Sequence, residues 1–245
     1  MTFWQRFHKK VEVARDYERR AALVGLRAPA KKCSMDRQAF LDAGRQLSVD
    51  PAHLAAVARV ESRGRSYDSQ GRLVTLFEPH IFHRVTKGAY KGLRMPVDWQ
   101  GEVVEAEVSY RSWRRLTDAQ AADDSYFHIY KLDNLARWDL MVRLYEIDER
   151  ALEAASYGAY QILGRNWRSL GYASCLDMVK SLYEGEGANM AAMVRFVRVN
   201  RILPALRAGD WFRFAKLYNG RGAARTYATR LSNAVKQAKQ AWGLM

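Results

Sequence analysis

The sequence has little cysteine and no long hydrophobic run. Its 245 residues include only Cys33 and Cys175, which are far apart, so neither a disulfide framework nor the Cys-x-x-Cys spacing of a zinc site is present. Both thiols are expected to be free and buried. Charged and polar residues interrupt the stretch from Met1 to Lys10, which excludes the apolar core of a secretory signal there. No run reaches membrane-spanning length, so action outside the cytoplasm would depend on another factor for release.

Acidic residues are scarce relative to basic ones. The chain has 40 Lys plus Arg against 26 Asp plus Glu, a formal charge of +14, which predicts attraction to nucleic acid, an anionic membrane or the anionic bacterial envelope. Seven tryptophans and thirteen tyrosines keep single-stranded nucleic acid open as an alternative partner. The basic residues are spread along the chain and no nucleic-acid-binding motif is present, so a specific nucleic-acid partner is not expected.

The hydrophobic pattern predicts a mainly α-helical protein with a small β-hairpin or sheet. Residues 1–34 are rich in Arg, Lys and Ala and indicate a basic helical arm and linker, followed by one domain over residues 35–245. A turn at Gln70-Gly71 and the β-prone run Leu73–Phe77 predict a hairpin or strand pair between helices. Apolar residues at helical spacing predict helices opening at Asp36, and over Pro51–Arg63, about Trp99 to Ala155, Trp211–Tyr218 and Tyr227–Ala238.

Glu61 is the first candidate for chemistry, because it ends an apolar helix. Asp50 is a helix cap, Pro51 suits the first turn, and Gly64 predicts the stop. Glu61 shares one helical face with the core position Val57, and burial of this kind raises the pKa of a carboxyl group, as a general acid requires. The alternative is a charged residue that only ends a helix.

Glu78 is a second candidate carboxylate, in the run Leu76–His83. Glycoside hydrolysis uses two carboxyl groups that flank a cleft, one as acid and one to activate water or stabilise the transition state. The alternative is a glutamate that bonds neighbouring backbone at a strand end. A metal site from Glu78, His80 and His83 is a weaker reading, because the spacing matches no zinc motif.

Two further segments combine small, aromatic and amide residues. Between Ser156 and Gly164, Gly158 permits close approach, Gln161 offers a donor and an acceptor, and Tyr157 and Tyr160 offer flat faces for sugar rings. The alternative is a helix start packed by aromatic rings. The other segment is Tyr218-Asn219-Gly220, where helix capping is a sufficient local explanation.

The order of Glu61-Ser62, Leu76–Phe82, Ala155–Gly164 and Tyr218-Asn219-Gly220 resembles the goose-type lysozyme and lytic transglycosylase superfamily. More closely, the chain is similar from about residue 36 to its end to the N-acetylmuramidase domain of bacteriophage endolysins. The resemblance implies a lysozyme-like fold of two helical lobes with a substrate cleft. It implies that Glu61 is the catalytic acid and Glu78 a second catalytic candidate. Tyr157 stands where a tryptophan is expected, and residues 98–150 form a longer, more charged connection than usual. The substrate-binding residues that follow are Ser62, His80, Tyr157, Gly158, Tyr160, Gln161, Tyr218 and Asn219.

The function that the resemblance implies is hydrolysis of the β-1,4 bond between N-acetylmuramic acid and N-acetylglucosamine in peptidoglycan. Synthesis in the cytoplasm of a bacterial host and action on the periplasmic wall after release are expected, without metal or organic cofactor and as a monomer. The basic arm over residues 1–34 is a candidate anchor to an anionic envelope. Two alternatives stay open: a lytic transglycosylase that forms 1,6-anhydro products, and an antibacterial effector with the same muramidase chemistry.

Overall fold

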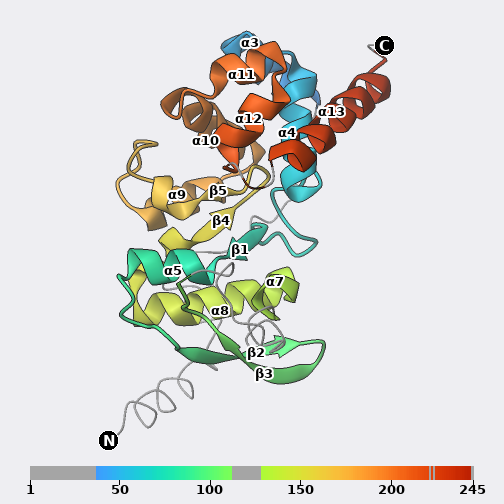
Figure 1. Cartoon of the computed structure of the whole chain (residues 1–245). Coiled ribbons are helices and arrows are strands. Elements are labelled where there is room, and N and C mark those ends of the chain that lie inside the picture. Colours follow the sequence, from blue (N-terminus) through green and yellow to red (C-terminus); the bar gives the residue numbers. More distant parts are fainter. Residues whose placement is uncertain (1–36, 112–127, 221, 223, 244–245) are drawn as a thin grey trace, which may run out of the picture.

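The computed structural model describes residues 37–111, 128–220, 222 and 224–243. Figure 1 shows two groups of helices, with a small sheet between them. We call residues 37–63 and 186–243 the helical lobe, and residues 64–111 and 128–185 the mixed lobe. The helical lobe contains α3 (Arg37–Leu47), α4 (Pro51–Ser62), α10 (Glu186–Val199), α11 (Leu203–Ala208), α12 (Trp211–Tyr218) and α13 (Ala224–Ala241). The mixed lobe contains β1 (Thr75–Phe77), α5 (Pro79–Val85), β2 (Arg94–Trp99), β3 (Glu102–Glu107), α7 (His128–Lys131), α8 (Asn134–Ile147), η3 (Glu149–Ala154), β4 (Ala155–Tyr157), β5 (Ile162–Leu163), η4 (Gly164–Asn166) and α9 (Cys175–Leu182).

Helix α4 carries Glu61 and begins as the sequence predicts. The Asp50 carboxylate accepts a hydrogen bond from the Ala52 amide at 2.9 Å, and Pro51 occupies the first turn. The stop differs in detail from the prediction. Arg63, at φ 60°, takes the left-handed position one residue before Gly64. The Gly64 amide then donates to the Ala58 carbonyl at 3.0 Å, which closes the helix end.

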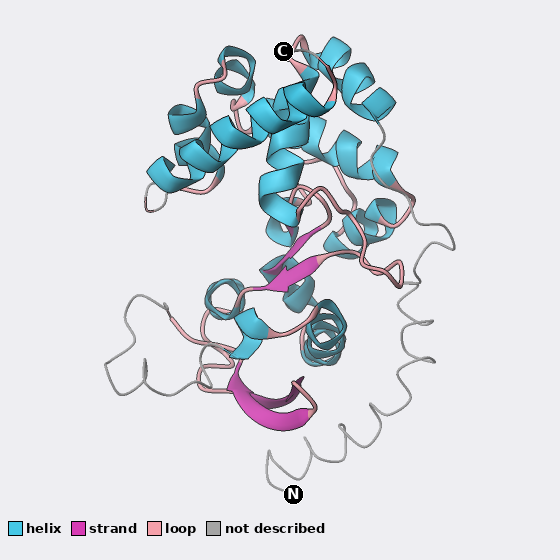
Figure 2. Cartoon of the chain, turned by 90° about the vertical axis from the view of Figure 1, so that its right-hand side faces the viewer, coloured by secondary structure: helices cyan, strands magenta, loops and turns pink. Residues whose placement is uncertain are grey.

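The predicted strand near Leu73–Phe77 is present as β1, but its partner is distant in sequence. β1 pairs antiparallel with β4, with Leu76 opposite Ser156, and β4 pairs with β5. The turn at Gln70-Gly71 closes only a single bridge, between Tyr67 and Leu73. Figure 2 shows this sheet between the two groups of helices. Its first strand, β1, ends at Phe77, immediately before Glu78.

The prediction of helix from about Trp99 was wrong for its first part. Strands β2 and β3 form a hairpin there, with Val97 opposite Val104. Gln100 and Gly101 have φ of 58° and 85°, as a tight hairpin turn requires. The later part is helical as predicted, and α8 buries Trp138 in the core.

The stripes predicted in the last third of the chain form the core of the helical lobe. α12 buries Phe214 and Ala215, α13 buries Tyr227 and Leu231, and α13 packs along both α12 and α4. This packing brings the C-terminal helices against the end of α4 that bears Glu61.

Two predictions depend on residues outside the described ranges. Cys175 is a buried free thiol, whereas Cys33 and the arm over residues 1–34 lie outside the described residues. Within the described ranges, no helix combines the length and the apolar character needed to cross a membrane.

Candidate active site

Glu61 lies in the last turn of α4 against α12 and α13. The Tyr227 hydroxyl donates a hydrogen bond to Glu61 Oε1, and the Asn219 side chain hydrogen-bonds the same carboxyl group. Arg230 adds positive charge nearby, and its guanidinium donates to the Val60 carbonyl at 3.2 Å. Three groups from the C-terminal helices therefore surround one carboxyl group.

Burial dominates the protonation of Glu61. Loss of hydration raises the pKa of the Glu61 carboxyl above its usual value, because the low-polarity surroundings disfavour the charged form. The hydrogen bonds from Tyr227 and Asn219, and the charge of Arg230, act in the opposite direction and lower this pKa. The net direction is upward, so the site favours a protonated carboxylic acid and also offers donors to the carboxylate that remains after proton transfer.

Tyr218 connects the Glu61 site to the sheet. Its hydroxyl donates a hydrogen bond to the Tyr160 carbonyl in the turn between β4 and β5. Its ring stacks on Phe214 with centroids 5.0 Å apart. Burial and the nearby Glu61 carboxylate raise the pKa of Tyr218, so its hydroxyl stays a donor.

Glu78 lies between β1 and α5 in the mixed lobe. The Ser156 hydroxyl donates to Glu78 Oε1 at 3.4 Å, and His80 Nε2 lies 3.6 Å from Glu78 Oε2. Burial raises the pKa of Glu78, while Ser156 and the charge of Arg84 lower it. Burial and the same arginine lower the pKa of His80, so the ring beside Glu78 favours its neutral form.

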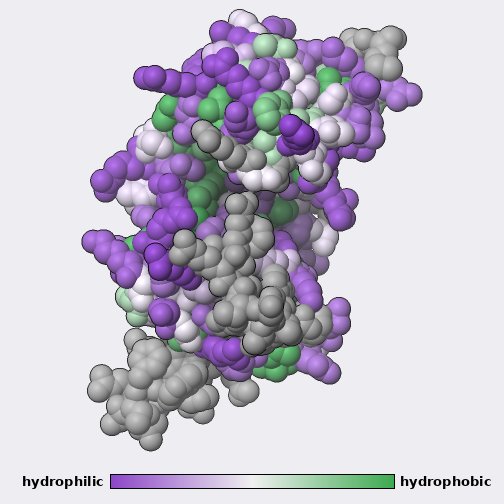
Figure 3. Space-filling model, viewed as in Figure 1, coloured by the Kyte–Doolittle hydropathy of each residue, from purple (hydrophilic) through white to green (hydrophobic). Residues whose placement is uncertain are grey.

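One short hairpin contacts the neighbourhood of each carboxyl group. Ser156, in β4, bonds Glu78, whereas the carbonyl of Tyr160, in the turn after β4, accepts from the Tyr218 hydroxyl, which interacts electrostatically with Glu61. The hairpin therefore contacts Glu78 directly and reaches the Glu61 site through Tyr218. Figure 3 shows the molecular surface hollowed between the two lobes, with nonpolar residues in the hollow.

Tyr157 and Tyr160 lie in the core. Each is 1% exposed, so neither ring offers a face to a ligand in this structure. The Tyr157 hydroxyl donates to the Leu152 carbonyl at 2.9 Å, and the Tyr160 hydroxyl contacts the Met190 sulfur at 3.3 Å. Both side chains support the hairpin from behind.

Gly158 and Gln161 shape the turn of this hairpin. A Cβ atom at Gly158, whose φ is 70°, would lie 2.0 Å from Asn189 Oδ1, so only glycine fits against α10. The Gln161 amide nitrogen donates to the carbonyls of Gly158 at 2.9 Å and Val74 at 3.2 Å. Gly158 is therefore required for packing, and Gln161 closes the turn while remaining partly exposed.

Ser62 acts within its own helix end. Its hydroxyl donates to the Ala58 carbonyl at 3.2 Å and accepts from the Arg65 amide at 3.1 Å. In contrast, Asn219 is exposed at the end of α12 while hydrogen-bonding Glu61. Of the predicted substrate-binding residues, Asn219 is thus both open to solvent and in contact with the candidate acid.

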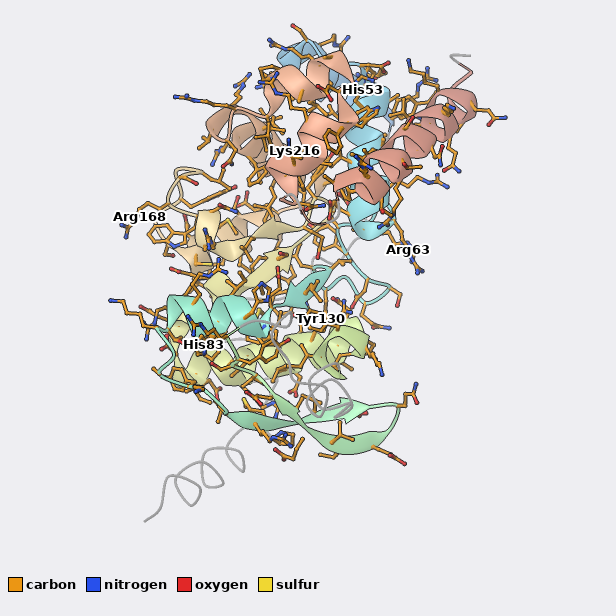
Figure 4. All side chains as sticks on the ribbon, viewed as in Figure 1. His53, Arg63, His83, Tyr130, Arg168 and Lys216 are labelled. Carbon is orange, nitrogen blue, oxygen red and sulfur yellow. The ribbon has the colours of Figure 1, made fainter. Side chains whose placement is uncertain are left out.

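The histidines of α5 do not gather a metal-binding set in the part of the chain that the structure describes, where no three His, Cys, Asp or Glu residues cluster around one point. His83, labelled in Figure 4, lies with its Nδ1 atom 3.4 Å from the Ser109 hydroxyl, whereas His80 faces Glu78.

The sequence did not predict roles at the site for three residues: Tyr227, Arg230 and Ser156. Tyr227 was interpreted only as part of an apolar stripe. Glu186 is a buried carboxyl group, which accepts a hydrogen bond from the Ser66 hydroxyl shortly after α4, and burial raises its pKa. The alternating Glu and Gly of residues 184–187 could have indicated Glu186, since this pattern marks an acidic helix start.

The fold and this site together define a class. A mostly helical fold of two lobes with a small antiparallel sheet, and a partly buried glutamic acid at a helix end, is the arrangement of a lysozyme-like glycoside hydrolase. The sequence profile of the N-acetylmuramidase family matches residues 50–239, and the chain belongs to this family. It is a lysozyme-type glycoside hydrolase whose substrate class is peptidoglycan.

One solved structure shows the same likeness in three dimensions. The chain is similar to the crystal structure of the endolysin of the Burkholderia phage AP3, with a TM-score of 0.61 and 28% sequence identity. The match covers 86% of this chain and 74% of that chain. No curated protein sequence matches the chain.

Proposed function

We propose that the protein hydrolyses the β-1,4 bond between N-acetylmuramic acid and N-acetylglucosamine, with Glu61 as the general acid. The observation that carries this proposal is a partly buried carboxyl group with a raised pKa that also contacts Tyr227 and Asn219. Family membership supports the bond, and the raised pKa supports the role of the residue.

The surroundings of Glu61 suit both states of a proton donor. Before reaction, burial raises the pKa of Glu61 and so favours the protonated carboxyl, which delivers a proton to the glycosidic oxygen as the bond breaks. After transfer, the negative charge on Glu61 is stabilised by the Tyr227 hydroxyl, the Asn219 amide and the nearby Arg230. These groups are in place before the reaction, so their reorganisation costs little.

Glu78 is the proposed second carboxyl group. In its ionised form it takes a proton from a water molecule that attacks the sugar from the opposite face, which inverts the anomeric centre if the two carboxyl groups lie about 6.5–9.5 Å apart. Burial raises the pKa of Glu78, whereas Ser156 and Arg84 act against burial and favour that ionised form. A role in orienting the neutral His80 is the alternative for Glu78.

Asn219 is the proposed contact to the N-acetyl sugar, supported by Tyr218 from behind. Asn219 is exposed and adjacent to Glu61, whereas the Tyr218 hydroxyl is already engaged by the Tyr160 carbonyl. Gln161, in the turn between β4 and β5, adds a partly exposed amide. We assign Tyr157 and Tyr160 to the scaffold, because their rings are buried. The proposed reaction uses two carboxyl groups of one chain and a water molecule.

The proposed biological setting is host lysis by a phage endolysin, supported by the likeness to the AP3 endolysin. Delivery as an antibacterial effector would use the same chemistry. Two observations test this setting: whether expression lyses bacteria with and without forced export, and which genes lie next to the gene for this protein. A holin gene beside it supports the endolysin, and a gene for an inhibitor of the enzyme overturns that assignment.

The chemistry is tested by digesting purified peptidoglycan and measuring the masses of the products by mass spectrometry. Wild type is expected to leave muramic acid reducing ends, and Glu61→Gln is expected to lose activity by about 10²–10⁴-fold with an unchanged circular dichroism spectrum. Glu102→Gln, at an exposed hairpin position, is the matched control and should retain activity. Products lighter by one water, with 1,6-anhydro ends, would identify a lytic transglycosylase, and full activity of Glu61→Gln would remove Glu61 from the reaction.

A further inference from the structure

Charge is distributed unequally between the two lobes. Among the described residues, the helical lobe has fourteen Lys or Arg and five Asp or Glu, a formal charge of +9. The mixed lobe has fourteen of each kind and is neutral. The excess positive charge of the described part of the chain therefore belongs to one lobe, which gives it a preferred orientation toward an anionic surface.

The last two helices carry much of this excess. Asp210 is the last acidic residue of the sequence, and the 35 residues that follow it contain seven Lys or Arg. Within the described residues, Lys239 pairs with Asp50 at 2.8 Å, whereas Arg213, Lys216 and Arg225 form no ion pair. Unpaired cations on one side of a protein attract anionic surfaces more strongly than neutralised ones.

The exposed side of α12 combines these cations with apolar side chains. Phe212 and Leu217 are each 47% exposed, and Arg213 and Lys216 lie between them on the same side of the helix. The Lys216 ammonium lies 5.3 Å from the centre of the Phe212 ring. We call these four residues the α12 outer face. Figure 3 shows nonpolar and hydrophilic residues interspersed over this lobe, and Figure 4 labels Lys216 on α12.

We propose that the α12 outer face docks on an anionic phospholipid bilayer. Arg213 and Lys216 pair with headgroup phosphates, while Phe212 and Leu217 enter the boundary between headgroups and acyl chains. A helix that presents apolar and cationic side chains together suits this boundary better than the backbone of a nucleic acid, where cations alone provide most of the attraction. The Phe212 ring is also already paired with Lys216, which leaves less of its face for stacking on a base.

Docking leaves the site around Glu61 separate. The opposite side of α12 buries Phe214 and Ala215, and Tyr218 at its end bonds the hairpin. The four side chains of the α12 outer face are exposed, and none of them belongs to the residues assigned to the reaction, so their substitution is designed to separate docking from chemistry. A bilayer contact of this kind would concentrate the enzyme beside a wall that lies next to a membrane.

The test is sedimentation of the full chain with vesicles of phosphatidylcholine containing about one third phosphatidylglycerol, and with pure phosphatidylcholine vesicles. Arg213→Glu with Lys216→Glu removes the cations of the face, and Phe212→Ser with Leu217→Ser removes its apolar groups. The matched control is Lys91→Glu with Lys180→Glu, at exposed positions of the mixed lobe, which makes the same change in net charge. Turnover of soluble peptidoglycan fragments reports the chemistry in each variant.

Anionic vesicles are expected to bind wild type at least tenfold more tightly than neutral ones. The Arg213/Lys216 pair should weaken this binding by about tenfold or more, the Phe212/Leu217 pair by several-fold, and the control by less than about twofold. Turnover of soluble fragments should stay unchanged in all three variants. An equal loss in the control overturns the proposal, because net charge alone would then explain binding. Equal binding to neutral vesicles, or selective loss of single-stranded DNA binding in the face variants without loss of vesicle binding, also overturns it.

Discussion

Tyr227 donates a hydrogen bond to Glu61 although 166 positions of sequence separate the two residues. The contact exists because α13 packs along α4. It places a neutral donor against a buried carboxyl group and so sets how readily Glu61 gives up and regains its proton. Much of the predicted chemistry of the site depends on this helix pair.

Replacing Tyr227 by phenylalanine should shift the pH dependence of activity. The Tyr227 hydroxyl lowers the pKa of Glu61, so its loss raises that pKa further and moves the alkaline limb of the kcat/KM profile to higher pH. Activity at the optimum should fall about 10- to 100-fold, because a hydrogen bond to a charged group contributes about 1.5–3 kcal/mol. Tyr172→Phe, away from the site, is the control. An alkaline limb that stays in place contradicts this assignment.

Glu61→Gln should stabilise the folded protein near and above neutral pH. Burial raises the pKa of Glu61 in the folded state above its ordinary value of 4.5. A raised pKa favours folding below the unfolded pKa, and this contribution is lost as pH rises through the folded pKa. Thermal unfolding should therefore give the variant a Tm higher by about 2–4 °C at pH 8, a gap that shrinks toward pH 4. A wild type as stable as the variant at pH 8 would refute the prediction.

Ser156→Ala should move the acidic limb of the profile if Glu78 is the base. The Ser156 hydroxyl lowers the pKa of Glu78, so its removal raises that pKa, and ionised Glu78 is reached only at higher pH. At pH 5 the variant should be about tenfold less active than wild type, with a smaller difference at pH 7. The comparison variant is Glu78→Gln, which has no carboxyl group to titrate and should show no further effect of Ser156→Ala. Coincident acidic limbs for wild type and Ser156→Ala would exclude Glu78 as the base.

Gly158→Ala should destabilise the fold more than Gly171→Ala. Both glycines have positive φ, 70° and 80°, and each substitution costs about 1–2 kcal/mol of backbone strain. A Cβ atom at Gly158 also meets Asn189 Oδ1 at 2.0 Å, whereas nothing lies within 4 Å of one at Gly171. The expected loss of Tm is about 2–8 °C for Gly171→Ala and at least several degrees more for Gly158→Ala. Equal losses would show that Asn189 moves aside freely.

Local rules predicted several elements of this protein correctly. Asp50 and Pro51 start α4 through contacts within one turn, and the spacing of Phe214 and Leu231 gave the buried sides of α12 and α13. The prediction of helix over the hairpin at Gln100-Gly101 was wrong, because Gln-Gly is not one of the Asn-Gly or Asp-Gly pairs that most strongly signal a two-residue turn.

The sequence by itself determined where Glu61 lies along its helix and which distant segments accompany it. Only the tertiary structure decided that Ser156 bonds Glu78, that Tyr227 bonds Glu61, and that the rings of Tyr157 and Tyr160 face the core. The physical reason is the distance along the chain over which each interaction acts. Capping and periodicity act within a few residues, whereas the pKa of a buried carboxyl group depends on desolvation and on donors supplied by helices that meet only when the chain folds.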